Sequence, residues 1–441
     1  MQPIPSQRSP LARLPFYYGW AVVVIAFITM GLGVNARISF SLLFPPILDE
    51  FGWTRGATAG FFAVGFLVSS VMSPLIGMAM DRLGPRLVFP FGGVIVACGL
   101  ILGTYASQPW HFFVTLGALV VGGSVIIAYI GHSAFLPNWF VRRRGLAIGI
   151  AFSGVGVFGM VMLPWMQTII DNDGWRAACW TLAILVLVTV VPLNLLCQRR
   201  RPQDLGLRPD GDAVPADQAA ADQTPDNVVD KAWADTDWTL RRAMATSRFW
   251  WLGGAFFCAL YAYYAVQVHQ TKYLLEIGFS SEEAAFALGL VGLFGVAGLL
   301  VLGHLSDRIG REWAWSIACV GFASCYGLLI LMGSHSAPWL VYPMVAAQGL
   351  LGYGMSPNYA AIPAELFQGR HYGTIFGTLS LAATIGGAAG PWLTGYLFDR
   401  YQSYEPAFWL APVLSALSIL CVWMAAPRKV RAVAGRIPRR A

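Results

Sequence analysis

Charged residues are scarce in this chain of 441 residues. Asp, Glu, Lys and Arg make up 12% of it, against about 25% in ordinary soluble domains, which need ions on their surface to stay in water. Apolar residues make up 57% of the chain. This balance excludes an ordinary soluble globular protein and indicates a chain that lies mostly in lipid.

The positions of the acidic residues and the small number of lysines give further information about the location of the protein. All 22 acidic residues fall in polar connections, in the tails or at the ends of apolar runs. Lysine occurs only at positions 231, 272 and 429, and the other basic residues are arginines, which hints at a GC-rich bacterial genome. We therefore expect the cell inner membrane as the location, with no carboxylate deep in the apolar core.

Several chemical sites are also missing from the sequence. The seven cysteines lie in apolar stretches and none forms a C-x-x-C pair, so we expect hydrophobic fillers without disulfides or a metal site. A G-x-G-x-x-G pattern at 154–159 lies inside an apolar run, where helix packing by small residues is expected and a dinucleotide site is not. With no nucleophile–base pair, ATPase motif or cleavable signal peptide, we expect neither an enzyme nor a cofactor.

Apolar runs long enough to cross a bilayer are abundant. A helix needs about 20 residues to do so. The sequence predicts twelve spans, at 18–48, 57–80, 88–105, 111–135, 145–170, 177–197, 249–275, 284–305, 313–332, 339–363, 372–398 and 407–426.

The basic residues indicate how these spans are oriented. With both termini in the cytoplasm, the outer connections hold only Arg55, Arg176, Lys272 and Arg400 of the 29 Lys and Arg residues. Because cytoplasmic loops carry an excess of basic residues, this orientation is favoured. The net charge of +7 is then a topology signal that meets anionic lipid, and no nucleic-acid partner is expected.

The predicted organisation has five parts. They are a cytoplasmic N-tail at 1–17, a six-helix bundle at 18–197, a disordered cytoplasmic linker at 198–248, a second six-helix bundle at 249–426 and a basic cytoplasmic C-tail at 427–441. The linker is rich in Pro, Asp, Ala and Gln, and it lacks the apolar surface to fold alone. We expect a solvated spacer, with partner binding as the alternative.

The two halves repeat each other. A G-x-x-x-D-R-x-G motif runs from Gly77 to Gly84 after the second span and again from Gly303 to Gly310 after the eighth. A second motif follows the fourth span at 139–149 and the tenth at 366–377, in nearly the same register. Such repeats place a transport site between two moving units.

These two motifs resemble the signature of the major facilitator superfamily, and the resemblance covers 17–426. Within that family the chain looks most similar to the monocarboxylate and oxalate–formate transporter branch, on the motifs at 17–20, 51–55, 138–145 and 174–176. It departs from that branch at two places. Animal monocarboxylate carriers have Asp and Arg in span 8, where this chain has Gly295 and Leu299, and span 11 lacks the Lys of the oxalate exchanger.

The resemblance implies a gate built from the motif charges. Asp81 would face the start of span 11 and an arginine at the end of span 4, of which Arg144 is one candidate, and plain interfacial anchoring is the alternative. The gating residues implied are Gly77, Asp81, Arg82, Gly84, Arg86 and Arg144 in the first half, and Gly303, Asp307, Arg308, Gly310 and Arg311 in the second.

One arginine lies well inside a span. Arg37 has no acidic residue near it in the sequence, and an ionised group at that depth costs about 2.5–3.5 kcal/mol. A guanidinium binds a carboxylate through two hydrogen bonds, so a substrate anion is favoured over snorkelling to the surface. The repeat maps Arg37 and Ser41 onto Tyr263 and Gln267, and each pair lies on one helix face.

Further polar residues complete the predicted substrate site. They are Asn35, Tyr261 and Tyr264 on spans 1 and 7, with Tyr129, His132, Gln348, Asn358 and Tyr359 on spans 4 and 10. His132 and His269 are the candidates for carrying a proton, because histidine titrates near neutral pH. A packing role for His132 and an interfacial position for His269 remain open.

The sequence thus predicts an all-α membrane protein of two pseudo-symmetric six-helix bundles. We expect a monomeric secondary transporter of a small organic anion, in particular a monocarboxylate, that works by rocker-switch alternating access. Coupling to protons is a hypothesis. The alternative function is efflux of amphipathic drugs or metabolites, although the span 5 pattern of such exporters and their intramembrane acids are absent.

Overall fold

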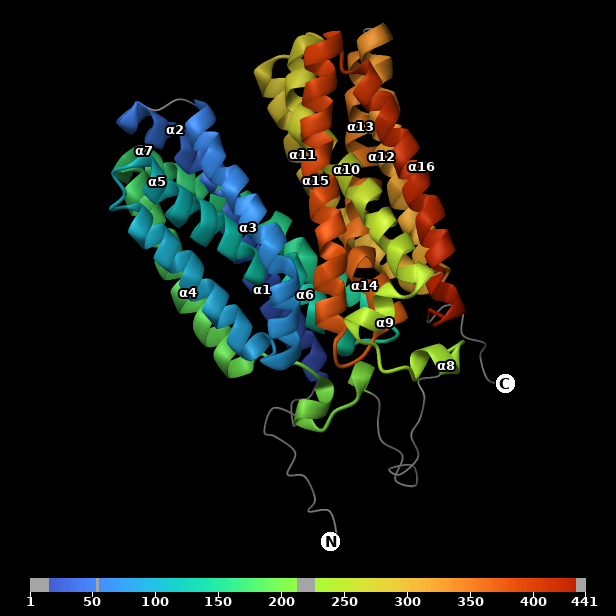
Figure 1. Cartoon of the computed structure of the whole chain (residues 1–441). Coiled ribbons are helices and arrows are strands. Elements are labelled where there is room, and N and C mark those ends of the chain that lie inside the picture. The colour runs from blue at the N-terminus through green and yellow to red at the C-terminus, as the bar shows by residue number, and fades with distance from the viewer. Residues whose placement is uncertain (1–15, 53–54, 212–226, 336, 434–441) are drawn as a thin grey trace. The chain divides into compact units, whose positions relative to one another are not determined.

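The computed structural model describes residues 16–52, 55–211, 227–335 and 337–433. Within these ranges the regular elements are helices, and the extended pairing is limited to one isolated bridge between Val228 and Arg431. The chain divides into two compact units, Met1–Gln223 and Thr224–Ala441. Figure 1 colours the helices of the first unit from blue to green and those of the second from yellow-green to red.

The first unit contains helices α1 to α7. Their bounds are α1 (Tyr18–Ile38), α2 (Phe40–Phe51), α3 (Arg55–Arg82), α4 (Pro85–Gly103), α5 (Pro109–Phe112), the π-helix η2 (Phe113–Gly122), the 3-10 helix η3 (Gly123–Ile127), α6 (Tyr129–Phe135), η4 (Leu136–Asn138) and α7 (Arg144–Cys197). Two short 3-10 helices, η5 (Pro202–Leu205) and η6 (Pro209–Gly211), follow α7.

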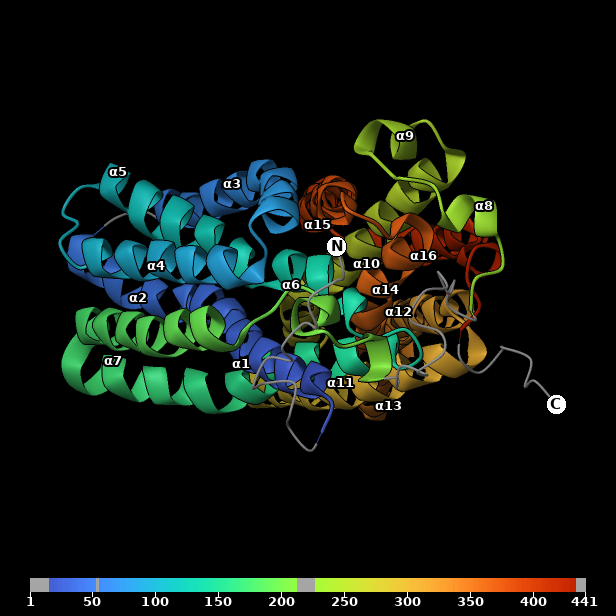
Figure 2. The same cartoon turned by 90° about the horizontal axis from the view of Figure 1, so that it is seen from below.

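The second unit repeats this order. It contains α8 (Lys231–Ala234), α9 (Leu240–Met244), α10 (Ser247–Glu276), α11 (Ser281–Ile309), α12 (Arg311–His335), η8 (Pro338–Leu340), α13 (Val341–Ala346), the π-helix η9 (Ala347–Leu351), the 3-10 helix η10 (Gly352–Met355), α14 (Ser356–Phe367), α15 (Tyr372–Tyr401), α16 (Glu405–Ala425) and η11 (Pro427–Lys429). Figure 2 shows α8 and α9 at the edge of this unit.

The twelve predicted spans each have a helical counterpart. Among the described residues, nine helices are long and apolar enough to cross a membrane. One of them, α7, holds two predicted spans that meet at Gly174, whose φ of 82° suits glycine. The second predicted span is the 28-residue α3, and the tenth is divided among η8, α13, η9, η10 and α14.

Helix packing follows the internal repeat. In the first unit α1 packs along α7, and in the second α10 packs along α15. A Cβ added at Gly154 would lie 2.2 Å from the carbonyl oxygen of Phe27, so α1 and α7 touch backbone to backbone there. The G-x-G-x-x-G pattern is therefore a helix-packing motif.

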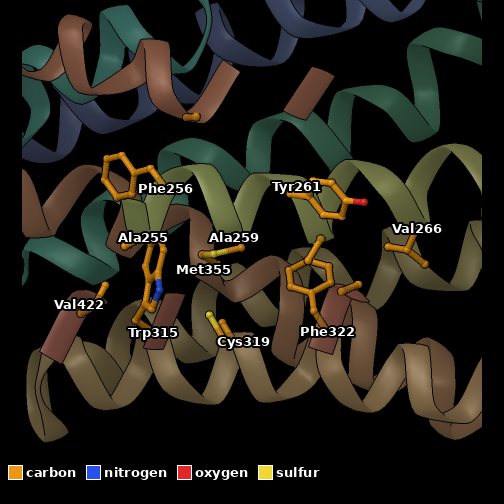
Figure 3. Packing of buried hydrophobic residues seen from close by; sticks show 14 of the residues in the cluster. Ala255, Phe256, Ala259, Tyr261, Val266, Trp315, Cys319, Phe322, Met355 and Val422 are labelled. Carbon is orange, nitrogen blue, oxygen red and sulfur yellow. The ribbon is translucent and has the colours of Figure 1, made fainter. Parts of the chain in front are cut away.

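The apolar core of the second unit draws buried residues from the helices α9 to α16. Figure 3 shows Trp315, Cys319 and Phe322 of α12 facing Phe256 and other residues of α10. The Trp315 indole N–H donates to the Ser418 hydroxyl, and that hydroxyl donates to the Ala255 carbonyl, so α12, α16 and α10 share one buried polar link. Such a link fixes the register of three otherwise apolar helices.

Parts of the predicted disordered linker are folded. Residues 198–211 include η5 and η6, and residues 227–247 include α8 and α9, where disorder was expected. Asp230 caps α8 and Thr239 caps α9 through hydrogen bonds to backbone N–H groups. The middle of the linker, 212–226, and the predicted tails up to residue 15 and from 434 lie outside the described residues.

Candidate functional site

The fourth and tenth spans are both irregular at the same place. In each, a π-helix is followed by a 3-10 helix and then by a short α-helix: η2, η3 and α6 in the first unit, and η9, η10 and α14 in the second. π-helical turns gather at functional sites, and interrupted helices in equivalent positions of two repeats point to a transport site. Sequence reasoning named both spans but expected them to be continuous. The glycines at 122–123, 349, 352 and 354 were the available signal.

Arg37 lies in the last turn of α1 and is half-buried. It interacts with other residues of the chain. The first predicted span breaks directly after it: α1 ends at Ile38, and Ser39 donates its hydroxyl to the Asn35 carbonyl at 2.8 Å before α2 begins. The backbone of Ser41 lies in the first turn of α2, but its side chain lies outside the described residues.

Asn35 is part of the packing of the first bundle. Its Nδ2 donates to the carbonyls of Gly31, at 2.8 Å, and of Val155, at 2.9 Å, so the amide joins α1 to α7. Its Oδ1 is buried and lacks a hydrogen-bond partner among the described residues. Asn35 thus contributes a helix–helix link, and its place in the predicted substrate site stays a proposal.

Tyr129 and His132 open α6, directly after the break in the fourth span. The Tyr129 ring makes an edge contact with Phe152 on α7, with centroids 5.1 Å apart. His132 is fully buried; its Nδ1 lies 2.9 Å from the Ala128 carbonyl and its ring stacks on Phe89 of α4 at 4.4 Å. Its Nε2 has no partner among the described residues. The pair therefore sits between helices of the first bundle.

Aromatic rings gather on the face of α10 predicted to meet the substrate. Tyr263 stacks on Tyr353 of η10 at 5.0 Å and contacts Tyr264 and Phe322 edge-on. Tyr263 and Tyr264 are half-buried and Gln267 is exposed, whereas Tyr261 is buried beside α15. Because polar side chains facing lipid are costly, we expect Gln267 to face the transport path.

The tenth span contributes buried amides. Gln348 accepts a weak contact from the Cys325 thiol at 3.9 Å, and its Nε2 has no partner among the described residues. The same holds for both polar atoms of Asn358. Tyr359 is satisfied, because its hydroxyl donates to Ser380 at 2.9 Å. Buried amides without partners are rare in proteins, so Gln348 and Asn358 can accept a polar guest such as water or a solute.

His269 lies further along α10. Its Nε2 is 3.0 Å from the Pro391 carbonyl of α15, and its ring is 5.5 Å from that of Tyr404. The side chain is half-buried. It differs from His132, which is fully enclosed, so the two proposed proton carriers have different access to water.

The first gating motif makes a contact that sequence reasoning missed. Asp81, at the end of α3, forms an ion pair with Arg200 of the linker at 3.5 Å, and Arg200 also donates to the Asp81 carbonyl. Arg144 is buried and donates to the carbonyls of Phe140 and Pro137, each at 3.1 Å. Gly84 has a φ of 73° at the turn into α4, a conformation that favours glycine.

The remaining residues of that motif lie around it. Gly77 is buried in α3, Arg82 is exposed at its end, and Arg86 donates from Nε to the Leu195 carbonyl at 2.7 Å. Arg200 could not be found by motif reading because it lies in a segment that was interpreted as a solvated spacer. Its nearness to the folded end of α7 was the available signal.

The second gating motif contains a buried charge cluster. The Arg311 guanidinium lies 2.7 Å from Asp307 and 2.7 Å from Glu365, which belongs to the end of α14. The three side chains are only 1%, 6% and 5% exposed. Gly310 turns the chain between α11 and α12 with a φ of 111°. Sequence reasoning missed Glu365, because this residue lies one position before the other repeated motif, which begins at residue 366 in this half.

Two other residues of this motif differ in exposure. Gly303 is buried in α11, whereas Arg308 projects from its last turn and is exposed. Arg311 is therefore the motif arginine that links two helices of the unit, since α14 carries its second carboxylate partner.

An ion pair lies at the end of the first unit away from the first gating motif. Arg176 forms two 2.7 Å hydrogen bonds to the carboxylate of Glu50, and the Trp175 indole N–H adds a third. The hydrogen bonds from Arg176 lower the pKa of Glu50, against the opposing effect of its limited burial. This pair fastens α2 to the connection within α7.

No metal site is apparent in the described parts of the chain. They contain no group of three or more His, Cys, Asp or Glu side chains that could hold an ion, and the cysteines there are unpaired.

Comparisons with a family model, with related sequences and with solved structures all find membrane transporters. The chain matches the model described as Major Facilitator Superfamily over residues 19–377 and 276–441. It is 25% identical to monocarboxylate transporter 13 of Rattus norvegicus, covering 89% of this chain and 86% of that one. It is 26% identical to monocarboxylate transporter 11 of Homo sapiens, covering 93% and 83%. Among solved structures, the proton:xylose symporter XylE shares the fold, with a TM-score of 0.70, 13% identity and coverage of 92% and 95%.

Proposed function

The chain belongs to the Major Facilitator Superfamily and is a membrane transporter, and from this membership we propose that it carries a small organic anion, in particular a monocarboxylate, by alternating access. The two units repeat one another in helix order and packing, as alternating access between two bundles requires. The energy would come from solute or ion gradients.

The observation that carries the proposal is Arg37. A half-buried guanidinium at the end of α1, inside a predicted span, is a costly group for a membrane protein to keep. Its planar fork of N–H donors matches the two oxygens of a carboxylate. The relatives named monocarboxylate transporters, which cover most of this chain, support the same substrate class.

Neutral groups of the second unit suit the rest of such a solute. Tyr263 and Tyr353 offer stacked rings, and Gln267 and Gln348 offer amide groups. A monocarboxylate has one charged end and one largely apolar end, and these neutral polar and aromatic groups suit the apolar end. Proton coupling through His132 or His269 belongs to this proposal as a hypothesis.

The aromatic face of α10 also favours the alternative function. Rings such as Tyr263, Tyr264 and Phe322 could bind amphipathic drugs or metabolites for efflux. The location in the cell inner membrane, the cytoplasmic termini and a monomeric state are parts of the proposal that follow from the distribution of arginines and from the family.

A thermal-shift screen of the purified protein separates the two functions. Short monocarboxylates should raise the melting temperature, and their amides should not, because only the carboxylate binds two guanidinium N–H groups. A ligand at about 100 times its Kd stabilises by about 2.7 kcal/mol. The shift should be lost in Arg37→Gln and kept in Arg241→Gln, which removes an exposed arginine of α9. Stabilisation by amphipathic compounds and by no acid would favour efflux.

A further inference from the structure

The central linker, residues 198–248, has no role in the proposed transport function. Its described ends are packed on the bundles: residues 198–211 on the first unit and residues 227–247 on the second. In both units the linker contacts the start of the second repeated motif: at Val141 and its neighbours in the first, and at Leu366 and Phe367, the last residues of α14, in the second. We propose that the two linker ends are clips that hold these segments and thereby control opening of the predicted cytoplasmic side.

The first clip centres on Asp210. One of its carboxylate oxygens accepts the backbone N–H groups of Val141, at 3.0 Å, and Arg142, at 2.9 Å. In return the Asp210 N–H donates to the carbonyl of Trp139 at 3.1 Å. Asp210 has a φ of 58°, which is uncommon outside glycine, so its backbone is held in a special conformation that presents the carboxylate.

The same clip reaches the first gating motif. Arg200 pairs with Asp81 at 3.5 Å, and the Trp139 indole N–H donates to the Arg199 carbonyl at 3.3 Å. Two short connections of the first unit, the one after α3 and the one before α7, are therefore tied to one stretch of linker. Salt should weaken the two ion pairs of this clip, Arg200–Asp81 at 3.5 Å and Arg142–Asp210 at 3.9 Å.

The second clip centres on Trp233. Its indole N–H donates to the carbonyl of Leu366, at the end of α14, at 2.7 Å. Its ring lies 4.5 Å from that of Trp238, and Trp238 meets Phe367 edge-on at 5.2 Å. The guanidinium of Arg248 covers the Trp233 ring at 4.1 Å. This clip is largely aromatic, so salt should affect it little.

The chain's C-terminal segment completes the second clip. The N–H groups of Val229 and Asp230 donate to the Val430 carbonyl, at 2.9 and 3.2 Å. The neighbouring Arg431 donates from Nε to the carbonyl of Glu365 at 3.2 Å. Because Glu365 also holds Arg311, the clip is in direct contact with the buried charge cluster.

The two clips use different chemistry on equivalent targets. A spacer that only joins two bundles needs contact with neither target, yet the linker grips the same segment of the repeat in both units. If the ends of the fourth and tenth spans move when the cytoplasmic side opens, the clip contacts must loosen, so these contacts favour the state in which that side is closed. A ligand or variant that releases the clips would therefore raise the population of the open state. The proposed effect of the clips on gating rests on the proposed alternating-access function. The packing of the two linker ends on the bundles does not depend on that function.

Hydrogen exchange of the full chain in lipid nanodiscs tests the docking. Asp210→Asn should speed exchange in 139–143 by about fivefold, the size expected when a neutral amide oxygen replaces the charged acceptor of these N–H groups, and should leave 366–371 unchanged. Trp233→Phe keeps an aromatic ring but removes the indole N–H, and it should act only on 366–371. Asp235→Asn, at an exposed linker aspartate, is the control. Unchanged exchange in both clip variants would overturn the proposal.

A second readout of the same experiment tests the gating role. Exchange in 129–138 and 356–365, the ends of the fourth and tenth spans, should rise in either clip variant if the clips restrain opening. Faster exchange in 139–143 or 366–371 without any change of exchange in 129–138 and 356–365 would overturn the gating role. Neither readout uses a substrate, so a protein that proved to carry no organic anion would leave this test valid.

Discussion

Arg176 grips Glu50 with both terminal nitrogens, at 2.7 Å each. The Nε of the same arginine donates to the Thr104 carbonyl at the end of α4, at 3.1 Å. The Glu50 end of α2 is thereby fastened to two other helices. Since α2 follows a break at Ser39, beside Arg37, this ion pair contributes to holding the second half of the first span in place.

The first prediction concerns the strength of this pair. Glu50→Gln should lower the free energy of unfolding by about 0.5–1 kcal/mol, the range for a well-oriented exposed pair, since the two side chains are 40% and 44% exposed. Reversing both charges, Glu50→Arg with Arg176→Glu, should restore part of the loss. A double-mutant cycle on thermal unfolding measures the coupling. The Lys272–Glu276 pair, 3.9 Å apart and with its lysine 66% exposed, is the control and should show almost no coupling.

The second prediction is a pH dependence with a definite sign. The pKa of Glu50 is lowered in the folded protein, first by the hydrogen bond from Arg176. Its stabilising effect is therefore complete above the unfolded value of about 4.3 and is lost as the pH falls through the lower folded value. The stability difference between wild type and Glu50→Gln should stay constant from about pH 7 to pH 5 and shrink below about pH 4. A loss of that difference already near pH 6 would mean that the pKa is raised.

The third prediction concerns the buried cluster of Arg311, Asp307 and Glu365. Arg311→Met leaves two carboxylates buried without their cation and should cost about 3–5 kcal/mol. Neutralising both partners as well, with Asp307→Asn and Glu365→Gln, should recover much of that loss. Arg308→Met, next to the cluster but exposed, is the control. Equal melting temperatures for Arg311→Met and Arg308→Met would refute the structural importance of the cluster.

The repeat made much of this architecture predictable. Because Asp81 and Asp307 share one motif, two similar units could be expected from the sequence, whereas the packing of α1 along α7 and of α10 along α15 is seen only in the structure. The breaks in the fourth and tenth spans do not show in the hydropathy, since a π-helix and an α-helix of the same residues have the same hydropathy, and the glycines at 122–123, 349, 352 and 354 were the signal left for them. Arg200 and Glu365 were missed for another reason: a partner in an ion pair is chosen by distance in space, and neither residue belongs to a recognisable pattern.

The fourth prediction separates the two histidines. His132 is enclosed by Phe89 and bonded to its own helix, so His132→Asn should lower the melting temperature through lost packing. His269 is half-buried and its Nε2 lies 3.0 Å from the Pro391 carbonyl, so His269→Gln, whose amide can keep this hydrogen bond, should lower the melting temperature less than His132→Asn. If the double variant kept the wild-type pH dependence of thermal stabilisation by a monocarboxylate, proton coupling through these two histidines would be excluded.

The last prediction concerns the close contact of α10 with α15. A Cβ added at Gly386 would lie 2.1 Å from the carbonyl oxygen of Phe257, and a backbone atom cannot swing aside as a side chain can. Gly386→Ala should therefore push the helices apart and cost about 1–3 kcal/mol. At Gly289 of α11 a Cβ would meet nothing within 4 Å, so Gly289→Ala should be neutral or slightly stabilising. Melting temperatures of the two variants test the difference directly. If both alanines were tolerated equally, α10 and α15 would not be in backbone contact, and the parallel contact at Gly154 in the first unit would also be in doubt.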